Sequence, residues 1–330
     1  MIIDIEDISF AYQSDAVLDD ITLHIERGVL TSIIGPNGVG KSTLLYCMNR
    51  LIEPQSGTVL IDGKEIGDYK LKDLAKEVGF VPYSSKDGFP LAVIDTVVMG
   101  CHPYSKVGSY KNDIRAAHSI LEMLGIEHLA FRPFSELSAG QRQKVMLARG
   151  IVQKPKILLL DEPTANLDVR HQMEVTRILE ELSRNEDMAV VMVSHDLNIA
   201  SKYSNQMIMM HDGRIFSAGA PSEVITTNNL RIVYGVDADV INHRSRPYVL
   251  LNGPLEDADD DRVFRLRQRV LQIPSQKDFV HRFLHIPDLH RLWSLMSGRW
   301  QTHRLHGCVS YNMGSLERCL IRIRYAGILG

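Results

Sequence analysis

The sequence of 330 residues lacks long apolar runs, paired cysteines and a surplus of basic charge. No uncharged apolar run approaches the roughly 20 residues that a membrane-spanning helix needs. We therefore expect that the chain does not cross a membrane by itself. The first residues alternate like a strand and show no basic region followed by an apolar one, so no signal peptide is expected.

Charge and cysteine usage exclude further classes of protein. The formal net charge of −3 provides no broad basic field, so nucleic acid is not expected as the main partner. The cysteines show neither CxxC pairing nor regular spacing, which argues against a disulfide framework or a cysteine metal site. A reducing cytoplasm fits this usage. The four cysteines are Cys47, Cys101, Cys308 and Cys319.

Apolar patterning alternates between strands and helices along most of the chain. The segments 157–161 and 188–194 are continuously apolar up to their last residue, as expected for strands covered on both faces, and a helical pattern lies between them. This alternation predicts a mainly parallel α/β core. The expected strands cover 2–10, 21–25, 30–34, 58–61, 78–81, 157–161 and 188–194, with a hairpin at 207–210 and 215–218; the expected helices cover 41–51, 112–124, 140–152 and 169–183.

Composition changes near residue 253. After it, Lys277 is the single lysine among many arginines, and an acidic cluster covers 257–261. We therefore expect a main domain over 1–252 and a C-terminal extension over 253–330, in which 263–271 has the pattern of a basic helix. A poorly ordered extension is the favoured interpretation. Contact with a nucleotide, a lipid surface or a metal, and a translated non-coding segment, are the alternatives.

A glycine-rich segment follows the expected strand 30–34 and opens the next expected helix. It matches GxxxxGK[ST], the P-loop pattern, in the strand–helix context that this pattern requires. Its glycines let backbone N–H groups turn toward phosphate oxygens, and the helix N-terminus adds positive potential. A chance glycine-rich turn is the alternative. The segment consists of Gly35, Pro36, Asn37, Gly38, Val39, Gly40, Lys41, Ser42 and Thr43.

Particular side chains of this segment and of two later strand ends have expected roles. Lys41 is expected to reach the β- and γ-phosphates of a nucleoside triphosphate, and the Ser42 hydroxyl to coordinate Mg²⁺. Asp161 and Glu162 end the strand 157–161, where Asp161 can hold the Mg²⁺ shell and Glu162 can polarise an attacking water. His195 ends the next strand and can bond the γ-phosphate. Taken alone, an acidic pair or a histidine at a strand end is more often a solvated terminus.

Further motifs resemble those of the ABC ATPases. The segment 137–143, Leu-Ser-Ala-Gly-Gln-Arg-Gln, is similar to the LSGGQ signature that separates this family from other P-loop proteins. The segment 165–168 resembles the D-loop, His195 the switch histidine, and Tyr12 the aromatic residue that stacks on adenine. The motifs occur in the family's order over residues 1 to about 240. Ser138 is also expected to cap the helix that follows it.

The resemblance implies an ABC ATPase fold: a P-loop core with a mainly parallel sheet, an antiparallel β subdomain and a helical subdomain at about 84–150. It implies ATP and Mg²⁺ as cofactors, and a head-to-tail dimer of two copies with ATP sandwiched between them. Ser138, Gly140 and Gln141 would then contact the nucleotide of the second copy.

Three segments resemble a subgroup of importers. The segments 81–85, 89–104 and 234–241 are similar to ATPases that serve importers of iron chelates, haem and cobalamin. This similarity implies transmembrane permease subunits that form the pore, an extracytoplasmic substrate-binding protein, and a location on the cytoplasmic face of the membrane. A soluble ABC ATPase and an exporter ATPase are the rival classes, but the sequence shows a single cassette without a long heptad run and carries the pattern at 89–104.

Three positions depart from the family pattern. Tyr83 stands where the family has the Q-loop glutamine, which helps to order Mg²⁺ and the attacking water. Ala139 replaces one of the two adjacent signature glycines, and Cys101 replaces an arginine that is common in the importer group. Because the P-loop lysine, the two carboxylates and the switch histidine are all present, we predict an active ATPase. A degenerate or regulatory ABC ATPase is the alternative.

Overall fold

The computed structural model describes residues 2–83, 91–103, 110–165 and 167–255. The chain divides into two units, Met1–Glu256 and Asp257–Gly330, and the described residues all belong to the first. Apart from 253–255, the expected extension lies outside the described residues, as does the basic helix expected at 263–271.

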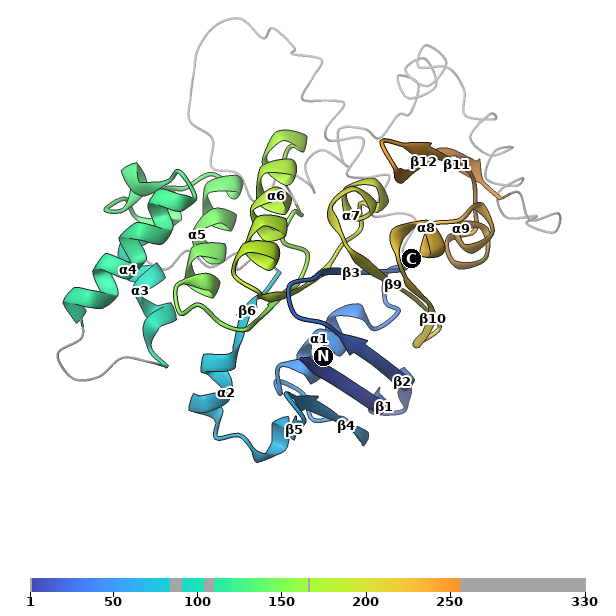
Figure 1. Cartoon of the computed structure of the whole chain (residues 1–330), viewed down its shortest axis with the longest axis horizontal. Helices are drawn as coiled ribbons and strands as arrows, with labels where there is room; N and C mark the ends of the chain where they lie inside the picture. Colours follow the sequence, from blue (N-terminus) through green and yellow to red (C-terminus); the bar gives the residue numbers. More distant parts are fainter. Residues whose placement is uncertain (1, 84–90, 104–109, 166, 256–330) are drawn as a thin grey trace, which may run out of the picture. The chain divides into compact units, whose positions relative to one another are not determined.

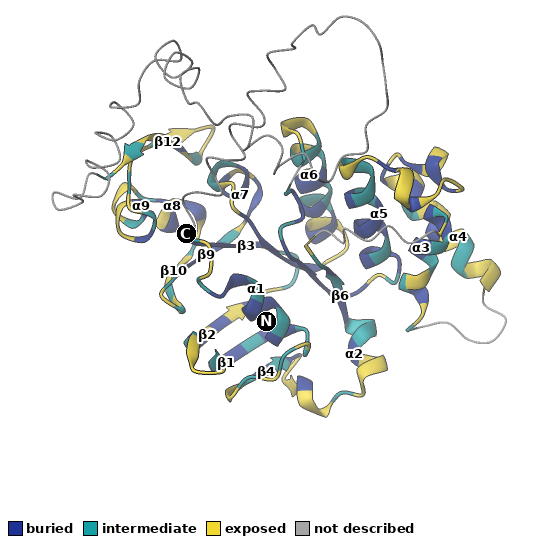
Figure 2. Ribbon diagram, turned by 180° about the vertical axis from the view of Figure 1, so that it is seen from behind, coloured by how far each residue is buried: buried dark blue, intermediate teal, exposed yellow. Residues whose placement is uncertain are grey.

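The central sheet of the described part contains six strands in the order β10-β9-β3-β8-β7-β6. All neighbours pair in parallel except the hairpin β9–β10. Every residue of β3, β7 and β8 is buried, because other elements cover both faces of the sheet, and this explains their continuous apolar sequences (Figure 2). The bounds are β3 (Leu30–Ile34), β6 (Val78–Val81), β7 (Ile157–Leu160), β8 (Ala189–Val193), β9 (Gln206–His211) and β10 (Arg214–Gly219).

A second, antiparallel sheet has the order β2-β1-β4-β5. Ile3, Ile5 and Ile8 of β1 are buried and belong to one apolar cluster with Leu44 and Leu45 of helix α1 (Lys41–Met48). The same cluster includes side chains of the central sheet, so α1 is fixed between the two sheets (Figure 1). The strands are β1 (Ile3–Tyr12), β2 (Asp15–Ile25), β4 (Ser56–Ile61) and β5 (Lys64–Glu65).

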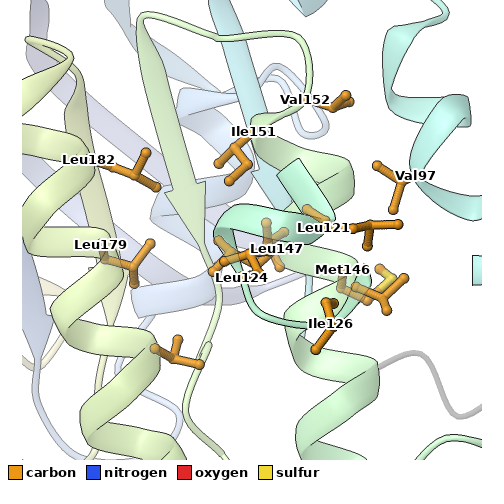
Figure 3. Close-up of a cluster of buried hydrophobic side chains, with 14 of the residues drawn as sticks. Val97, Leu121, Leu124, Ile126, Met146, Leu147, Ile151, Val152, Leu179 and Leu182 are labelled. Atoms are coloured by element: carbon orange, nitrogen blue, oxygen red, sulfur yellow. The ribbon is translucent and has the colours of Figure 1, made fainter. Parts of the chain in front are cut away.

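A helical subdomain lies at one end of the central sheet (Figure 1). It contains α3 (Val93–Val98), α4 (Tyr110–Met123) and α5 (Ala139–Ile151). Its apolar side chains form one cluster with those of α6 (Val169–Asn185), which covers the sheet (Figure 3). Four short 3-10 helices are also present in the described part: η1 (Ile66–Asp68), η2 (Met99–Cys101), η3 (Glu127–Leu129) and η4 (Phe134–Glu136).

The described chain ends in a hairpin that the sequence patterns did not predict. Strands β11 (Val236–His243) and β12 (Arg246–Pro254) form a separate two-stranded antiparallel sheet. The remaining helices are α2 (Leu71–Glu77), α7 (Leu197–Tyr203), α8 (Pro221–Val224) and α9 (Thr227–Tyr234). In the described ranges, no helix combines the length and apolar character needed to cross a bilayer.

The expected mixture of a mainly parallel core, an antiparallel sheet and a helical subdomain is confirmed. One helix boundary was wrong. The helix expected over 41–51 ends at Met48, because Asn49 leaves the helical region with φ −103° and ψ 8°, and Arg50 follows with a positive φ of 52°. The strand expected over 2–10 extends to Tyr12, which places that aromatic residue at a strand end.

Candidate functional site

The P-loop connects β3 to α1 through a turn that requires glycine. Gly35, Gly38 and Gly40 have φ values of 148°, 81° and 102°, a range that side-chain-bearing residues rarely adopt. A Cβ atom at Gly40 would lie 2.7 Å from the carbonyl oxygen of Val17, and one at Gly35 would lie 2.5 Å from that of Met210. The backbone therefore approaches two neighbouring strands closely at the point where it curls into α1.

Lys41 is held inside this turn. Its side chain is 5% exposed, and Nζ donates hydrogen bonds to the carbonyl oxygens of Gly35 and Pro36 at 2.8 and 2.6 Å. Burial lowers the pKa of Lys41, while the nearby charges of Glu162 and Asp161 oppose that shift. The geometry thus places an ammonium group between the loop and two carboxylates, as expected for a phosphate-binding lysine.

Asp161 follows β7 and meets α1. The Ser42 hydroxyl donates to its Oδ1 at 2.8 Å, and the Tyr46 hydroxyl donates to its Oδ2 at 3.1 Å. Ser42 and Asp161, which the sequence assigned to one metal, therefore lie together. A hydroxyl and a buried carboxylate are the hard oxygen donors that suit Mg²⁺, which usually takes one or two protein ligands together with substrate phosphates.

Tyr46 is a site residue that sequence reasoning missed. It lies four positions after Ser42 on α1, so both side chains share one face of the helix, and this spacing was the available signal. Burial raises the pKa of the Tyr46 hydroxyl, and the charge of Asp161 raises it further. The phenol stays protonated and acts as a hydrogen-bond donor that fixes the carboxylate.

Glu162 and His195 form a direct pair. They follow the neighbouring parallel strands β7 and β8, whose carboxyl ends lie at the same edge of the sheet. The Nε2 atom of His195 lies 2.5 Å from Oε1 of Glu162. Both side chains retain partial exposure, 42% for His195 and 24% for Glu162, so the pair is open to a reactant.

A cavity of about 480 Å³ lies beside this pair. Its wall combines the Glu162–His195 pair, the D-loop region and apolar side chains of β12. The cavity is lined by, among others, Glu162, Thr164, Ala165, His195, Val249 and Leu251. The expected D-loop therefore borders the same space as the two candidate catalytic groups, although its residue Asn166 lies outside the described residues.

Tyr12 lies at the end of β1 with 47% of its surface exposed. Its ring packs edge-to-face on Phe10, with the centroids 4.8 Å apart. The adjacent strand β2 contributes Val17, which contacts the P-loop at Gly40. The antiparallel sheet thus carries the candidate adenine-stacking residue and also borders the phosphate loop.

The signature residues lie on a different element from the P-loop. Ser138 caps α5: its Oγ accepts from the Gln141 backbone N–H at 3.3 Å, and Gln141 Oε1 accepts from the Ser138 N–H at 3.0 Å. This reciprocal arrangement is a capping box, and it confirms the expected helix cap. Ala139 is exposed and Gly140 partly buried. In Figure 1, α5 belongs to the helical subdomain and lies apart from α1.

The departures from the family pattern have distinct surroundings. Tyr83 follows β6, which pairs with β7, so it lies near the strand end that carries Asp161. Its side chain is 47% exposed. Cys101 is buried in the core of the helical subdomain, and burial raises the pKa of its thiol to about 11. In the importer-like segment 89–104, residues 91–103 are described and the others lie outside the described residues.

Comparison with known proteins decides the family. The family model described as ABC transporter matches residues 18–165. An uncharacterized ABC transporter ATP-binding protein of Methanocaldococcus jannaschii is 43% identical over 250 residues, which cover 76% of this chain and 98% of that protein. The chain belongs to the ABC transporter family. It is an ATP-binding cassette of the kind that binds and hydrolyses ATP.

Two relatives of this cassette are named for import. A hemin import ATP-binding protein of Bordetella avium is 34% identical over 258 residues, covering 76% of this chain and 98% of that protein. A cobalamin import ATP-binding protein of Halobacterium salinarum is 36% identical over 234 residues, covering 71% of this chain. This chain spans only 59% of the length of the cobalamin relative.

Solved structures confirm the ABC ATPase fold. The cassette matches an inward-facing ABC transporter assigned to the metal-chelate type with a TM-score of 0.66 and 27% identity, over 77% of this chain and 98% of that one. It also matches a dimeric ATP-binding cassette in a post-hydrolysis state bound to ADP and Pi, with a TM-score of 0.60 and 28% identity, over 66% of this chain and 98% of that one.

Proposed function

We propose that this chain hydrolyses ATP to energise an ABC importer for iron chelates, haem or cobalamin. The observation that carries the ATPase part is the convergence of Lys41, Asp161, Glu162 and His195 at one edge of the central sheet. Each is bonded or charge-coupled to another member of the group, or to the loop that binds phosphate.

Nucleotide binding is assigned to the P-loop and Tyr12. The backbone N–H groups of the glycine turn and the N-terminus of α1 stabilise the triphosphate, and Lys41 exchanges its carbonyl partners for phosphate oxygens. Tyr12 stacks on the adenine. Mg²⁺, when bound by Ser42 and Asp161, neutralises the negative charge that develops on the phosphates.

Hydrolysis is assigned to Glu162 and His195. The Glu162 carboxylate accepts a hydrogen bond from the attacking water and takes its proton. His195 orients this carboxylate through the 2.5 Å contact of its Nε2, and when ATP is bound the Nε2–H is shared between the carboxylate and the γ-phosphate. Because little covalent chemistry is asked of the protein in phosphoryl transfer, these residues act mainly by positioning and by charge stabilisation.

The dimer is the state in which the site is complete. Ser138, Gly140 and Gln141 lie on α5, apart from the P-loop of their own chain, so we assign them to the nucleotide of a second copy. The dimeric form of a related cassette supports this assignment. ATP binding closes the two copies head to tail, and hydrolysis reopens them.

The names of relatives support the proposed transport class. Proteins named for hemin and cobalamin import and a structure assigned to the metal-chelate type support an importer of large metal-containing substrates. The expected partners are transmembrane permease subunits and, indirectly, an extracytoplasmic substrate-binding protein, with the cassette on the cytoplasmic face. Tyr83, which precedes the importer-like segment 89–104, and Leu91 and Met99 within that segment expose apolar surface, where a permease helix is expected to dock.

The test is phosphate release from Mg-ATP by the wild type and by Glu162→Gln. We expect release to fall by roughly 10²–10⁴-fold, the range for loss of a positioned base, while ATP binding persists. Glu186→Gln, at an exposed position after α6, is the matched control and should retain the wild-type rate. A wild type that binds ATP but releases no phosphate, even with its permease, would favour the regulatory alternative and implicate Tyr83.

A further inference from the structure

The first turns of α5 and α6 meet at a glycine and a histidine. A Cβ atom built on Gly140 of the signature would lie 3.5 Å from Cγ and from Cδ2 of His171, and 3.8 Å from its Nδ1. The imidazole ring therefore packs against the backbone of the signature motif.

The ring of His171 is held from the D-loop side. Its Nδ1 lies 2.8 Å from Oδ1 of Asp168, and the same oxygen accepts the His171 backbone N–H at 2.9 Å. These bonds lower the pKa of Asp168, the D-loop residue that caps α6. Gln172 ties the same turn to the residue before the D-loop through a 3.3 Å bond from Nε2 to the Thr164 carbonyl. The imidazole is thus fixed in orientation by the start of its own helix.

The two helices make further contacts along their length. Figures 1 and 2 show α5 and α6 side by side. One turn beyond the Gly140–His171 contact, Lys144 of α5 bonds Glu174 of α6 at 3.1 Å. Farther along, apolar side chains of both helices, among them Leu147 and Leu179, belong to one buried cluster (Figure 3). The contact of His171 with Gly140 therefore lies at the signature end of the interface between α5 and α6.

We propose that His171 is a positioning residue, which sets the orientation of the signature turn of α5 and links it to Asp168 of the D-loop. This inference rests on the proposed function, in which that turn directs backbone N–H groups at the nucleotide of a second copy. The direction of those N–H groups depends on how the first turn of α5 packs against the ring of His171. A displacement of about 1 Å in such a donor costs about 10²-fold in rate.

The experiment measures two quantities in a Glu162→Gln background, which retains ATP. One is the ATP affinity of the chain, by calorimetry with Mg-ATP. The other is the ATP concentration that gives half-maximal dimer, by size-exclusion chromatography with light scattering. For an added His171→Ala change, we expect the affinity to stay within about twofold and the half-maximal concentration to rise at least about tenfold. His171→Gln, which keeps a donor for Asp168, should recover part of the loss.

Arg177→Ala is the matched control. Arg177 lies on the same helix, is 71% exposed and pairs with Glu181, away from the signature. The Arg177→Ala variant should keep the ATP affinity and the half-maximal ATP concentration for dimerisation at the parent values. If His171→Ala does not fold, Asp168→Asn decides, because it keeps a capping oxygen but weakens the bond to the ring; it should raise the half-maximal concentration several-fold.

The inference would be overturned if the His171→Ala protein dimerised at the same ATP concentration as the parent. The same outcome for Asp168→Asn would overturn it where His171→Ala does not fold. Either result would leave the ATPase assignment intact. A fall in ATP affinity that fully accounts for the lost dimer would also overturn it, because the role would then lie in the chain's own site. A parent protein that binds no ATP would instead refute the proposed function.

Discussion

Glu162 adopts a left-handed backbone conformation with φ 50°. Residues other than glycine, asparagine and aspartate seldom do so, and such positions concentrate at functional sites. Pro163 follows it, and the residue before a proline is disfavoured in the right-handed α region. The outcome is a carboxylate 2.5 Å from His195. The Asp-Glu pair at a strand end predicted the presence of this carboxylate, but not the backbone turn that aims it.

Gly40 provides a test of the phosphate loop at the residue scale. Gly40→Ala would combine φ 102° with a Cβ 2.7 Å from the Val17 carbonyl oxygen, so the loop must shift away from β2. We expect a loss of about 1–3 kcal/mol in the free energy of unfolding and an ATP affinity at least about tenfold weaker. Gly63→Ala is the control: φ is 74° with open space, so about 1–2 kcal/mol should be lost without an effect on ATP. Urea unfolding measures the free energy of unfolding of each variant, and ATP titration measures its ATP affinity. Unchanged ATP affinity in Gly40→Ala would contradict the loop geometry.

The buried thiols give a second residue-scale prediction. Burial raises the pKa of Cys47 and of Cys101 to about 11, so both stay protonated at pH 8 and their thiolate fractions are about 10²-fold below that of an exposed cysteine. In the native protein, both should react with iodoacetamide at least about 10²-fold more slowly than in urea, with each peptide followed separately by mass spectrometry. Rapid native alkylation of either residue would show that its burial is wrong.

At the scale of elements, buried strands were predictable and the last hairpin was not. Because both faces of β7 and β8 are covered, every residue of these strands is buried, and their sequences are continuously apolar. This pattern can be recognised in the sequence alone. Only Ala238 and Val249 are buried in β11 and β12. Their turn places Arg244 and Ser245 at φ 54° and 62°, where asparagine and glycine are the usual signals. Neither apolar alternation nor turn chemistry marked this hairpin.

Asn198 anchors the hairpin to α7, the helix that follows the switch histidine. Its Oδ1 accepts the Val249 N–H at 2.7 Å, and its Nδ2 donates to the Val249 carbonyl at 3.2 Å. Asn198→Ala leaves two backbone groups unpaired, so we expect a loss of about 1–3 kcal/mol and faster amide exchange over 236–254. Asn252→Ala, which removes an exposed bond to Asp239, should change neither. Exchange over 236–254 that is unaffected by Asn198→Ala would contradict the anchoring role.

At the scale of the whole molecule, the sequence predicted which candidate residues the central sheet brings together, but apolar patterning did not predict that a site would be shared between two copies, as proposed above. The P-loop, Asp161, Glu162 and His195 meet because parallel strands bring their carboxyl ends to one edge, which is a consequence of the predicted sheet. The signature lies on α5, in the helical subdomain. Its assignment to a second copy came from family resemblance, because apolar patterning within one chain carries no information about contacts between two chains.

Every role proposed for this chain requires that its P-loop binds ATP. Isothermal titration calorimetry of the folded protein with Mg-ATP tests it most directly, with Lys41→Ala as the comparison. We predict saturable binding of one ATP per wild-type chain and an affinity at least about 10²-fold weaker in Lys41→Ala, which loses the ammonium that the carbonyls of Gly35 and Pro36 hold in place. Folded wild-type protein that gives no saturable binding of ATP in the presence of Mg²⁺ would contradict the account.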